Sequence, residues 1–154
     1  MKSRKLYIFI LIAIVLFGFL LRLNDLWKEG YWMDEIITIK HAQEKSPLGV
    51  IEKVGQYEGA PFGHYLLLHY WIEIFDINEI STRMLSVIFG TLSIIAMFFV
   101  GRLLFGDRIG LVSSMLLATS MLQVLYSRET RLYAMYTFLS LLATYFFIKI
   151  YLLS

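Results

Sequence analysis

The feature that most constrains this chain is a set of apolar runs long enough to cross a lipid bilayer. The first covers about residues 6–23, and three more cover residues 84–105, 109–126 and 133–153. A transmembrane helix needs roughly 20 mostly apolar residues to cross a hydrocarbon core of about 30 Å. Each run therefore predicts one span, and the chain is expected to be an all-α, multi-pass integral membrane protein with about four transmembrane helices.

The composition agrees with lipid as the solvent. Of the 154 residues, 58% are hydrophobic and 16% aromatic, more than a soluble domain of this size can cover with polar surface. The net charge of only +2 argues against nucleic acid as a partner and leaves membrane lipids as the expected one. No flexible linker or repeat divides the chain, so residues 1–154 are expected to form a single membrane unit.

The first apolar run has the charged start of a signal peptide, with Lys2, Arg4 and Lys5 before it. The run is longer than a usual signal-peptide core, and no small-residue cleavage site follows it. We therefore expect an uncleaved first span. Its basic residues place the N-terminus in the cytoplasm and the first loop outside.

A fifth apolar run, residues 62–75, contains two histidines and a glutamate. Its length favours an interfacial or re-entrant helix over a span, although a short tilted span is the alternative. If this run does not cross, Arg102, Arg108 and Lys149 all fall on the cytoplasmic side, where basic residues are enriched. The charge pattern therefore favours four spans.

The external loop, residues 24–83, is too long for a simple connection and carries charges of both signs. Pro47 directly after Ser46 is typical of a helix start. We expect a structured external cap with juxtamembrane helices, and a pair between Glu79 and Arg83 where the second span begins.

Acidic and basic residues gather on the external side. Asp34 and Glu35 follow the first span, and the external turn "SRETR" carries Arg128 and Arg131 around Glu129. Spaced three apart, the two arginines are expected on one helical face, where guanidinium groups bind phosphate oxygens. The alternative is that they pair with Glu129 and lipid headgroups. For the acidic pair the alternative is a solvated loop.

These residues resemble a known family. The chain is similar to the N-terminal part of multi-pass glycosyltransferases of the C-type fold (GT-C) that use lipid-linked sugars. The nearest groups are the dolichyl-phosphate-mannose–protein mannosyltransferases and the lipid A aminoarabinose transferases. The resemblance covers nearly the whole chain, in the motifs "YWMDE", "YEGAPFGHYLLLHYW", "NEISTRMLSVIFGTLSI", "GRLLFGDRIGLVSSMLLATS" and "YSRETRLYAMYTF".

The resemblance implies roles for the acidic residues. It makes Asp34 catalytic, with Glu35 beside it, and Glu129 a second acidic site. Glu58 is a supporting acidic residue, in a loop motif where the family has two prolines and this chain has Ala and Pro. The family fold also implies that residues 62–75 form a juxtamembrane helix.

The expected reaction moves a sugar from a polyprenyl-phosphate donor to a hydroxyl acceptor at the external membrane face. Asp34 would take the acceptor proton in an inverting displacement, and Arg128 and Arg131 would bind the donor phosphate. A divalent metal ion is one option, held by Asp34 and Glu129. The candidate substrate-lining residues are Trp32, Tyr57, His64 and Tyr133, for which an interfacial aromatic belt is the alternative.

Members of this family are several times longer than this chain. The expected partners therefore include the remaining helices of a longer enzyme, or a partner subunit. A non-catalytic subunit that binds lipid phosphate is the main alternative function. A small transporter is disfavoured because the charges gather at the ends of the spans.

Overall fold

The computed structural model describes residues 2–28 and 30–151, and this part of the chain is all-α, without strands. The predicted all-α class is therefore confirmed. Its helices are α1 (Lys2–Leu23), α2 (Met33–Ala42), α3 (Pro47–Tyr57), α4 (Gly63–Phe75), α5 (Glu79–Phe105), α6 (Asp107–Thr119), α7 (Met121–Tyr126) and α8 (Tyr133–Tyr151).

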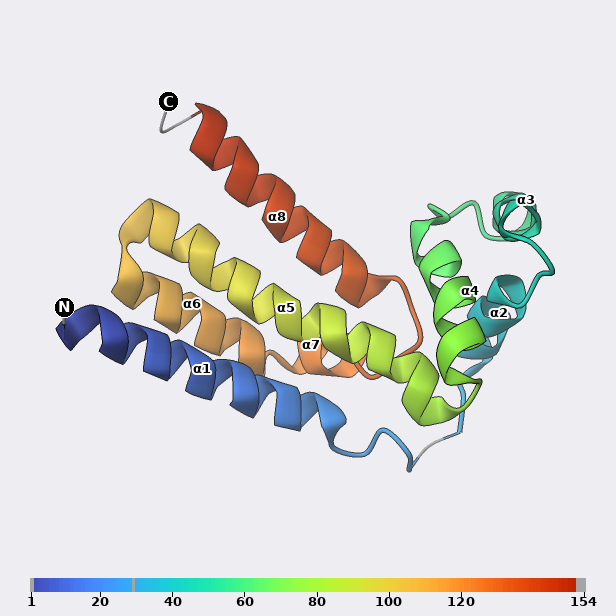
Figure 1. The fold of residues 1–154 in the computed structure, drawn as a ribbon, viewed down its shortest axis with the longest axis horizontal. Helices are drawn as coiled ribbons and strands as arrows, with labels where there is room; N and C mark the ends of the chain where they lie inside the picture. The colour runs from blue at the N-terminus through green and yellow to red at the C-terminus, as the bar shows by residue number, and fades with distance from the viewer. Residues whose placement is uncertain (1, 29, 152–154) are drawn as a thin grey trace.

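The helices divide into a bundle and a cap (Figure 1). The bundle consists of α1, α5, α6, α7 and α8, with α5 packed against α1, α6 and α8. The cap consists of α2, α3 and α4, which gather beyond one end of the bundle (Figure 1). Helices α1 and α6 run toward the cap, whereas α5 and α8 run away from it (Figure 1).

Among the described residues, three helices are long and apolar enough to cross a membrane: Lys5–Leu23, Glu79–Phe105 and Tyr133–Tyr151. They correspond to the first, second and fourth predicted spans. The second begins earlier than predicted because the Asn78 side chain caps it, accepting a hydrogen bond from the Ser81 amide at 2.9 Å. Helix α4 is too short to count among them, in agreement with the prediction for residues 62–75.

The predicted span over residues 109–126 is wrong as one continuous helix. Helix α6 ends at Thr119, and Ser120 is extended, with φ −60° and ψ 119°, before α7 begins. The carbonyl of Ala118 bonds instead to Arg22 Nη1 at 3.2 Å. A side chain from another helix therefore donates a hydrogen bond to a carbonyl at the end of α6. Such a contact is a known cause of a break in the hydrogen bonding of a helix. The two short helices still lead the chain back to the cap end (Figure 1).

Arg22 is the buried cation that organises this break. Its side chain is fully buried, and Nε donates to Ser127 Oγ at 3.1 Å while Nη1 also donates to the carbonyl of Gly18 at 2.9 Å. Within the described residues no carboxylate pairs with Arg22. Carbonyls and a hydroxyl therefore hold the charge, and they join α1 to the far ends of α6 and α7.

Gly90 on α5 allows this contact. A Cβ at this position would lie 2.1 Å from Ser127 Oγ and 2.9 Å from Arg22 Nε. No real Cβ tolerates such distances, so only glycine lets α5 approach the turn that follows α7.

We expect Gly90→Ala to destabilise the protein by about 1–3 kcal/mol, because the new methyl group must displace Ser127 and Arg22. Gly55→Ala in α3 is the matched control. Nothing lies within 4 Å of a Cβ there, so it should stabilise by about 0.5–1 kcal/mol. Unfolding of the full chain in detergent, followed by circular dichroism, measures both. Equal midpoints for Gly90→Ala and the wild type would contradict this account of the packing.

Candidate functional site

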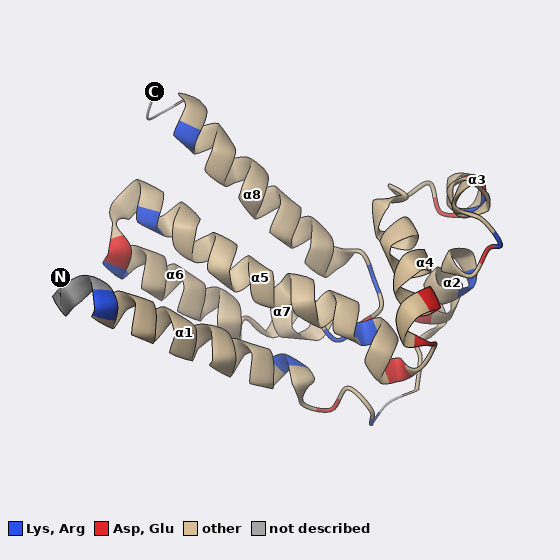
Figure 2. Cartoon of the chain, viewed as in Figure 1, with Lys and Arg blue, Asp and Glu red and all other residues tan. Residues whose placement is uncertain are grey.

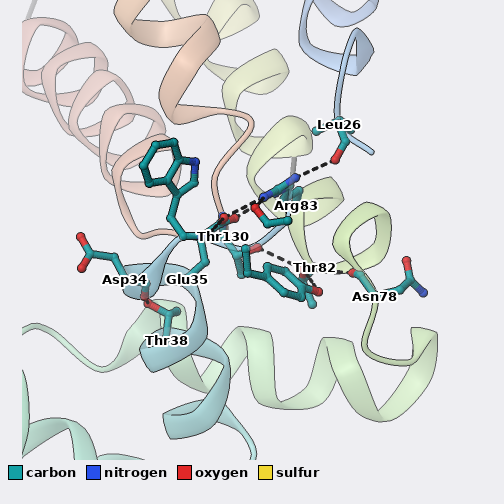
Figure 3. A network of polar contacts seen from close by, with 11 residues as sticks. Leu26, Asp34, Glu35, Thr38, Asn78, Thr82, Arg83 and Thr130 are labelled. Carbon is teal, nitrogen blue, oxygen red and sulfur yellow. Dashed lines mark hydrogen bonds and ion pairs between the residues drawn. The ribbon is translucent and has the colours of Figure 1, made fainter. Parts of the chain in front are cut away.

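The candidate site lies at the junction of the cap and the bundle. Three segments meet there: the first turn of α2, the first turns of α5, and the turn of residues 127–132 between α7 and α8 (Figure 3). Charged side chains from all three segments occupy this junction, although they are far apart in the sequence.

Glu35 is at the centre of the junction, with only 1% of its surface exposed. Its Oε1 accepts hydrogen bonds from Arg83 Nε at 2.9 Å and from the Thr130 amide at 2.8 Å. Its Oε2 accepts from Arg83 Nη2 at 2.8 Å and from the Trp32 amide at 3.1 Å. Both oxygens are thus occupied, and Glu35 joins α2, α5 and the 127–132 turn (Figure 3).

Arg83 extends this network to the end of α1. Its Nη1 donates to the Leu26 carbonyl at 2.7 Å, and Nη2 donates to the Gly30 carbonyl at 3.1 Å. The expected pair of Arg83 with Glu79 is wrong, because among the described residues Arg83 forms its ion pair with Glu35. Glu79 lies on the same helix face, but the cap brings a better-placed partner to Arg83.

Two carboxyl groups of the junction have pKa values that are shifted in opposite directions. Burial alone would raise the pKa of Glu35, but hydrogen bonds from Arg83 and from the Thr130 and Trp32 amides outweigh it and lower the pKa. Burial, followed by the charge of Glu35, raises the pKa of Glu129. A carboxyl group with a raised pKa in a cleft is typical of a functional site.

Asp34 is the exposed neighbour of Glu35, and its side chain points away from the Glu35 network (Figure 3). It lines a cleft of about 260 Å³, which we name the Asp34 cleft. The residues around this cleft are Trp32, Met33, Asp34, Glu35, Glu129 and Arg131. The structure therefore brings together predicted site residues from two distant parts of the chain.

A second cleft, of about 170 Å³, adjoins the first, and we name it the Arg128 cleft. Its lining residues are Asp25, Leu26, Trp32, Arg83, Leu125, Arg128 and Glu129. The two clefts share Trp32 and Glu129. Arg128 is anchored beside the bundle, since its Nη2 donates to the Leu21 carbonyl near the end of α1.

The expectation that Arg128 and Arg131 share a helical face is wrong, because residues 127–132 form a turn. Arg131 reaches toward α2, where its Nη1 donates to Thr38 Oγ1 at 2.8 Å and to the Asp34 carbonyl at 3.3 Å. The two arginines therefore line different clefts, Arg128 the Arg128 cleft and Arg131 the Asp34 cleft.

Two other predicted site residues, Glu58 and Tyr133, lie near Arg131. Glu58 Oε2 is 4.0 Å from Arg131 Nη1, and the Tyr133 ring centroid is 5.8 Å from the Arg131 guanidinium. Tyr57 is 70% exposed but lines neither the Asp34 cleft nor the Arg128 cleft.

His64 lines neither of these clefts. It is 1% exposed, and neither ring nitrogen has a hydrogen-bond partner in the described part of the chain. Its predicted substrate-lining role is therefore corrected, because the first turn of α4 packs this ring into the interior. Burial, reinforced by the charge of Arg131, lowers the pKa of His64 to about 4.

The expected metal ligands do not form a complete protein site. Asp34 and Glu129 share one cleft, but no group of three or more His, Asp or Glu side chains that could hold a metal ion occurs among the described residues. Mg²⁺ is often held by one or two carboxylates together with water and substrate phosphate, so the metal role of this pair stays a prediction.

Sequence reasoning missed Arg83 as the partner of Glu35, and Arg22 and Thr130 altogether. The signal for Arg83 was present: an arginine near the start of an apolar span needs a buried partner. Its position did not identify that partner, because Glu79 and Glu35 both carry a carboxylate.

Comparison with known protein families matches the chain to the family described as Dolichyl-phosphate-mannose-protein mannosyltransferase. It covers residues 59–152, more than half of the chain. No curated protein and no solved structure matches. The matched residues include Arg83 and the 127–132 turn, whereas Asp34 and Glu35 precede them.

Substitutions of the two adjacent carboxylates, Glu35 and Asp34, are expected to change the stability of the protein by very different amounts. Glu35→Gln removes the carboxylate charge from a buried ion pair with Arg83 and should cost about 3–5 kcal/mol. Asp34→Asn, at an exposed position, should change stability by less than about 0.5 kcal/mol. Chemical unfolding in detergent measures both. Similar losses for the two variants would contradict the separation of roles.

His64 should make stability depend on pH. Its pKa lies at about 4 in the folded state, against an ordinary value of 6.5, so the unfolded state binds more protons between these values. Stability should therefore fall as pH falls through this window, by up to about 1.4 kcal/mol per pH unit. The difference between the wild type and His64→Leu isolates this effect from that of other groups. A difference that stays constant from about pH 7 to pH 4 would refute it.

Proposed function

Because this chain belongs to the dolichyl-phosphate-mannose-protein mannosyltransferase family, we propose that it forms the donor-binding and catalytic part of a membrane glycosyltransferase. The enzyme transfers a sugar from a polyprenyl-phosphate donor to a hydroxyl acceptor at the external membrane face. The observation that carries this proposal is the pair of adjoining clefts, each lined by carboxylates and arginines: Asp34 and Arg131 line one, Arg128 lines the other, and Glu129 lines both.

The two clefts match the two halves of such a donor. The phosphate needs cations, and Arg128 lines a cleft that also contains the apolar side chains of Leu26 and Leu125. The sugar would extend past the shared Trp32 into the Asp34 cleft. This arrangement puts the phosphate and lipid beside the bundle and the reacting carbon beside the carboxylates.

The chemistry is an inverting displacement at the anomeric carbon. The acceptor oxygen forms a bond to this carbon as the carbon–oxygen bond to phosphate breaks, and the bonding electrons leave with the phosphate oxygen. Asp34 accepts the proton of the acceptor hydroxyl. Arg128 stabilises the negative charge that grows on the phosphate, and Glu129, whose raised pKa suits proton exchange, lines both clefts.

Glu35 and Arg131 act as positioning residues in this proposal. Glu35 holds the turn through the Thr130 amide, one residue from Glu129. Arg131 bonds to the Asp34 carbonyl and to Thr38, which fixes the first turn of α2. The two contacts set the separation of Asp34 from Glu129 before any substrate binds.

The proposed orientation rests on charge. Lys5 at the start of α1, Arg102 at the end of α5, Arg108 at the start of α6 and Lys149 at the end of α8 lie at the end of the bundle away from the cap. Figure 2 shows the mostly basic residues at this end and the mixture of acidic and basic residues in the cap. Basic residues are enriched on the cytoplasmic side, so the N-terminus is cytoplasmic and the cap external.

A second candidate is a non-catalytic subunit that binds lipid phosphate within a glycosylation complex. One observation favours it: the family match begins after Asp34, so it supports the phosphate side of the site better than the catalytic side. In this case, the remaining helices or a partner subunit supply the base.

Transfer of sugar from a labelled polyprenyl-phosphate donor, in membranes expressing the chain with its partner helices or subunit, tests the proposal. Asp34→Asn should lower the rate at least about 100-fold with donor binding retained, because only proton acceptance is lost. Arg128→Gln should weaken donor binding as well. Glu52→Gln, at an exposed site on α3 outside both clefts, is the matched carboxylate control and should leave the rate unchanged.

The outcomes separate the two candidates. Unchanged transfer in Asp34→Asn, at wild-type expression, would rule out Asp34 as the base. Donor binding that is weakened by Arg128→Gln, together with sugar transfer that is unchanged by Asp34→Asn, would establish the non-catalytic subunit.

A further inference from the structure

The cap contains a larger cavity that the proposed reaction does not yet use. It has a volume of about 490 Å³ and lies between α2 and α3; we name it the α2–α3 pocket. Its lining residues are Ile37, Lys40, His41, Lys53, Tyr57 and Glu58. The volume is in the range of small-molecule sites, roughly 300–1,000 Å³.

The walls of this pocket combine an aromatic face with hydrogen-bonding groups. The Tyr57 ring is 70% exposed, with Lys53 Nζ 5.3 Å from its centroid. His41 is 6% exposed, and its Nδ1 has no hydrogen-bond partner in the described part of the chain, lying 3.7 Å from Glu58 Oε1. A buried polar atom without a hydrogen bond is uncommon, and here it indicates that a bound molecule supplies the missing partner.

This combination suits a saccharide. The polarised C–H bonds of a sugar ring pack on the negative face of an aromatic ring, while its hydroxyls donate to and accept from charged and imidazole groups. An apolar lipid tail fits less well, because Ile37 is the one aliphatic side chain in the lining. The described cap is helical and offers no strand edge to which an extended peptide could add.

The pocket and the Asp34 cleft lie along the same face of α2. Asp34, Ile37 and His41 are spaced i, i+3 and i+7 on α2, which places them on the same side of the helix. Seven residues of helix span about 10 Å. Glu58 provides a second link, because it lines the pocket and lies 4.0 Å from Arg131 of the Asp34 cleft.

We propose that the α2–α3 pocket binds a short saccharide as the acceptor and directs its free hydroxyl along α2 to Asp34. This inference rests on the proposed function, because it supplies the acceptor for that transfer. It assigns a binding role to Lys40, His41 and Lys53, and makes the acceptor a sugar chain rather than a polypeptide.

Binding of the full chain, in lipid nanodiscs, to a printed panel of mono- to tetrasaccharides tests the pocket directly. The wild type should bind a subset of the panel. Tyr57→Ala should weaken that binding about tenfold, through loss of the stacking face. Tyr70→Ala is the matched control, since Tyr70 is half exposed on α4 and outside the pocket lining; it should bind like the wild type.

Three results would overturn the inference. They are no binding to any saccharide at millimolar concentration, equal effects of Tyr57→Ala and Tyr70→Ala, and binding of a Ser/Thr-rich peptide that Tyr57→Ala abolishes while saccharides stay unbound.

A parallel measurement of polyprenyl-phosphate-sugar binding, on the same nanodiscs, separates this inference from the proposed function. Donor binding without saccharide binding overturns the acceptor pocket and leaves the proposed function standing. Saccharide binding without donor binding overturns the proposed function and the acceptor role together.

Discussion

The ion pair between Glu35 and Arg83 is the interaction on which the junction depends. Desolvating two charges is expensive, and the cost is recovered only where each charge has good geometry and enough hydrogen bonds. Here the carboxylate receives four hydrogen bonds, two of them from backbone amides of Trp32 and Thr130. Because these donors come from separate segments, the pair forms only when the cap, α5 and the turn after α7 are all in place.

Helix geometry explains why the adjacent residues Asp34 and Glu35 lie in different environments. Consecutive residues on a helix point about 100° apart, so the first turn of α2 turns Glu35 inward and leaves Asp34 facing a cleft. The buried carboxylate fixes the position of the exposed one. A free carboxylate on a rigid support is what an enzyme needs from a base, since its geometry is set before the substrate arrives.

The long apolar helices α1, α5 and α8 could be predicted from the sequence because apolar length is a local property. The break at Ser120 could not, because its cause is Arg22, a residue 96 positions away from the Ala118 carbonyl that it binds. The separation of Arg128 from Arg131 was missed because a helical spacing was applied to a turn. The sequence predicted that acidic and basic residues gather at one face. It did not predict which of them pair, because the pairs form only where the cap packs against the bundle.

The 127–132 turn shows how two buried arginines hold one functional segment. Arg22 binds Ser127 at the start of the turn, and Glu35, held by Arg83, binds Thr130 near its end. Neither contact uses the charged side chains of the turn, which remain directed at the clefts. The backbone of the turn is thus fixed by residues outside it, Arg22 and Glu35, whose contacts leave the side chains of Arg128, Glu129 and Arg131 in the lining of the clefts. The cost of burying the two guanidinium groups is offset by the hydrogen bonds that they make to carbonyls, a hydroxyl and a carboxylate.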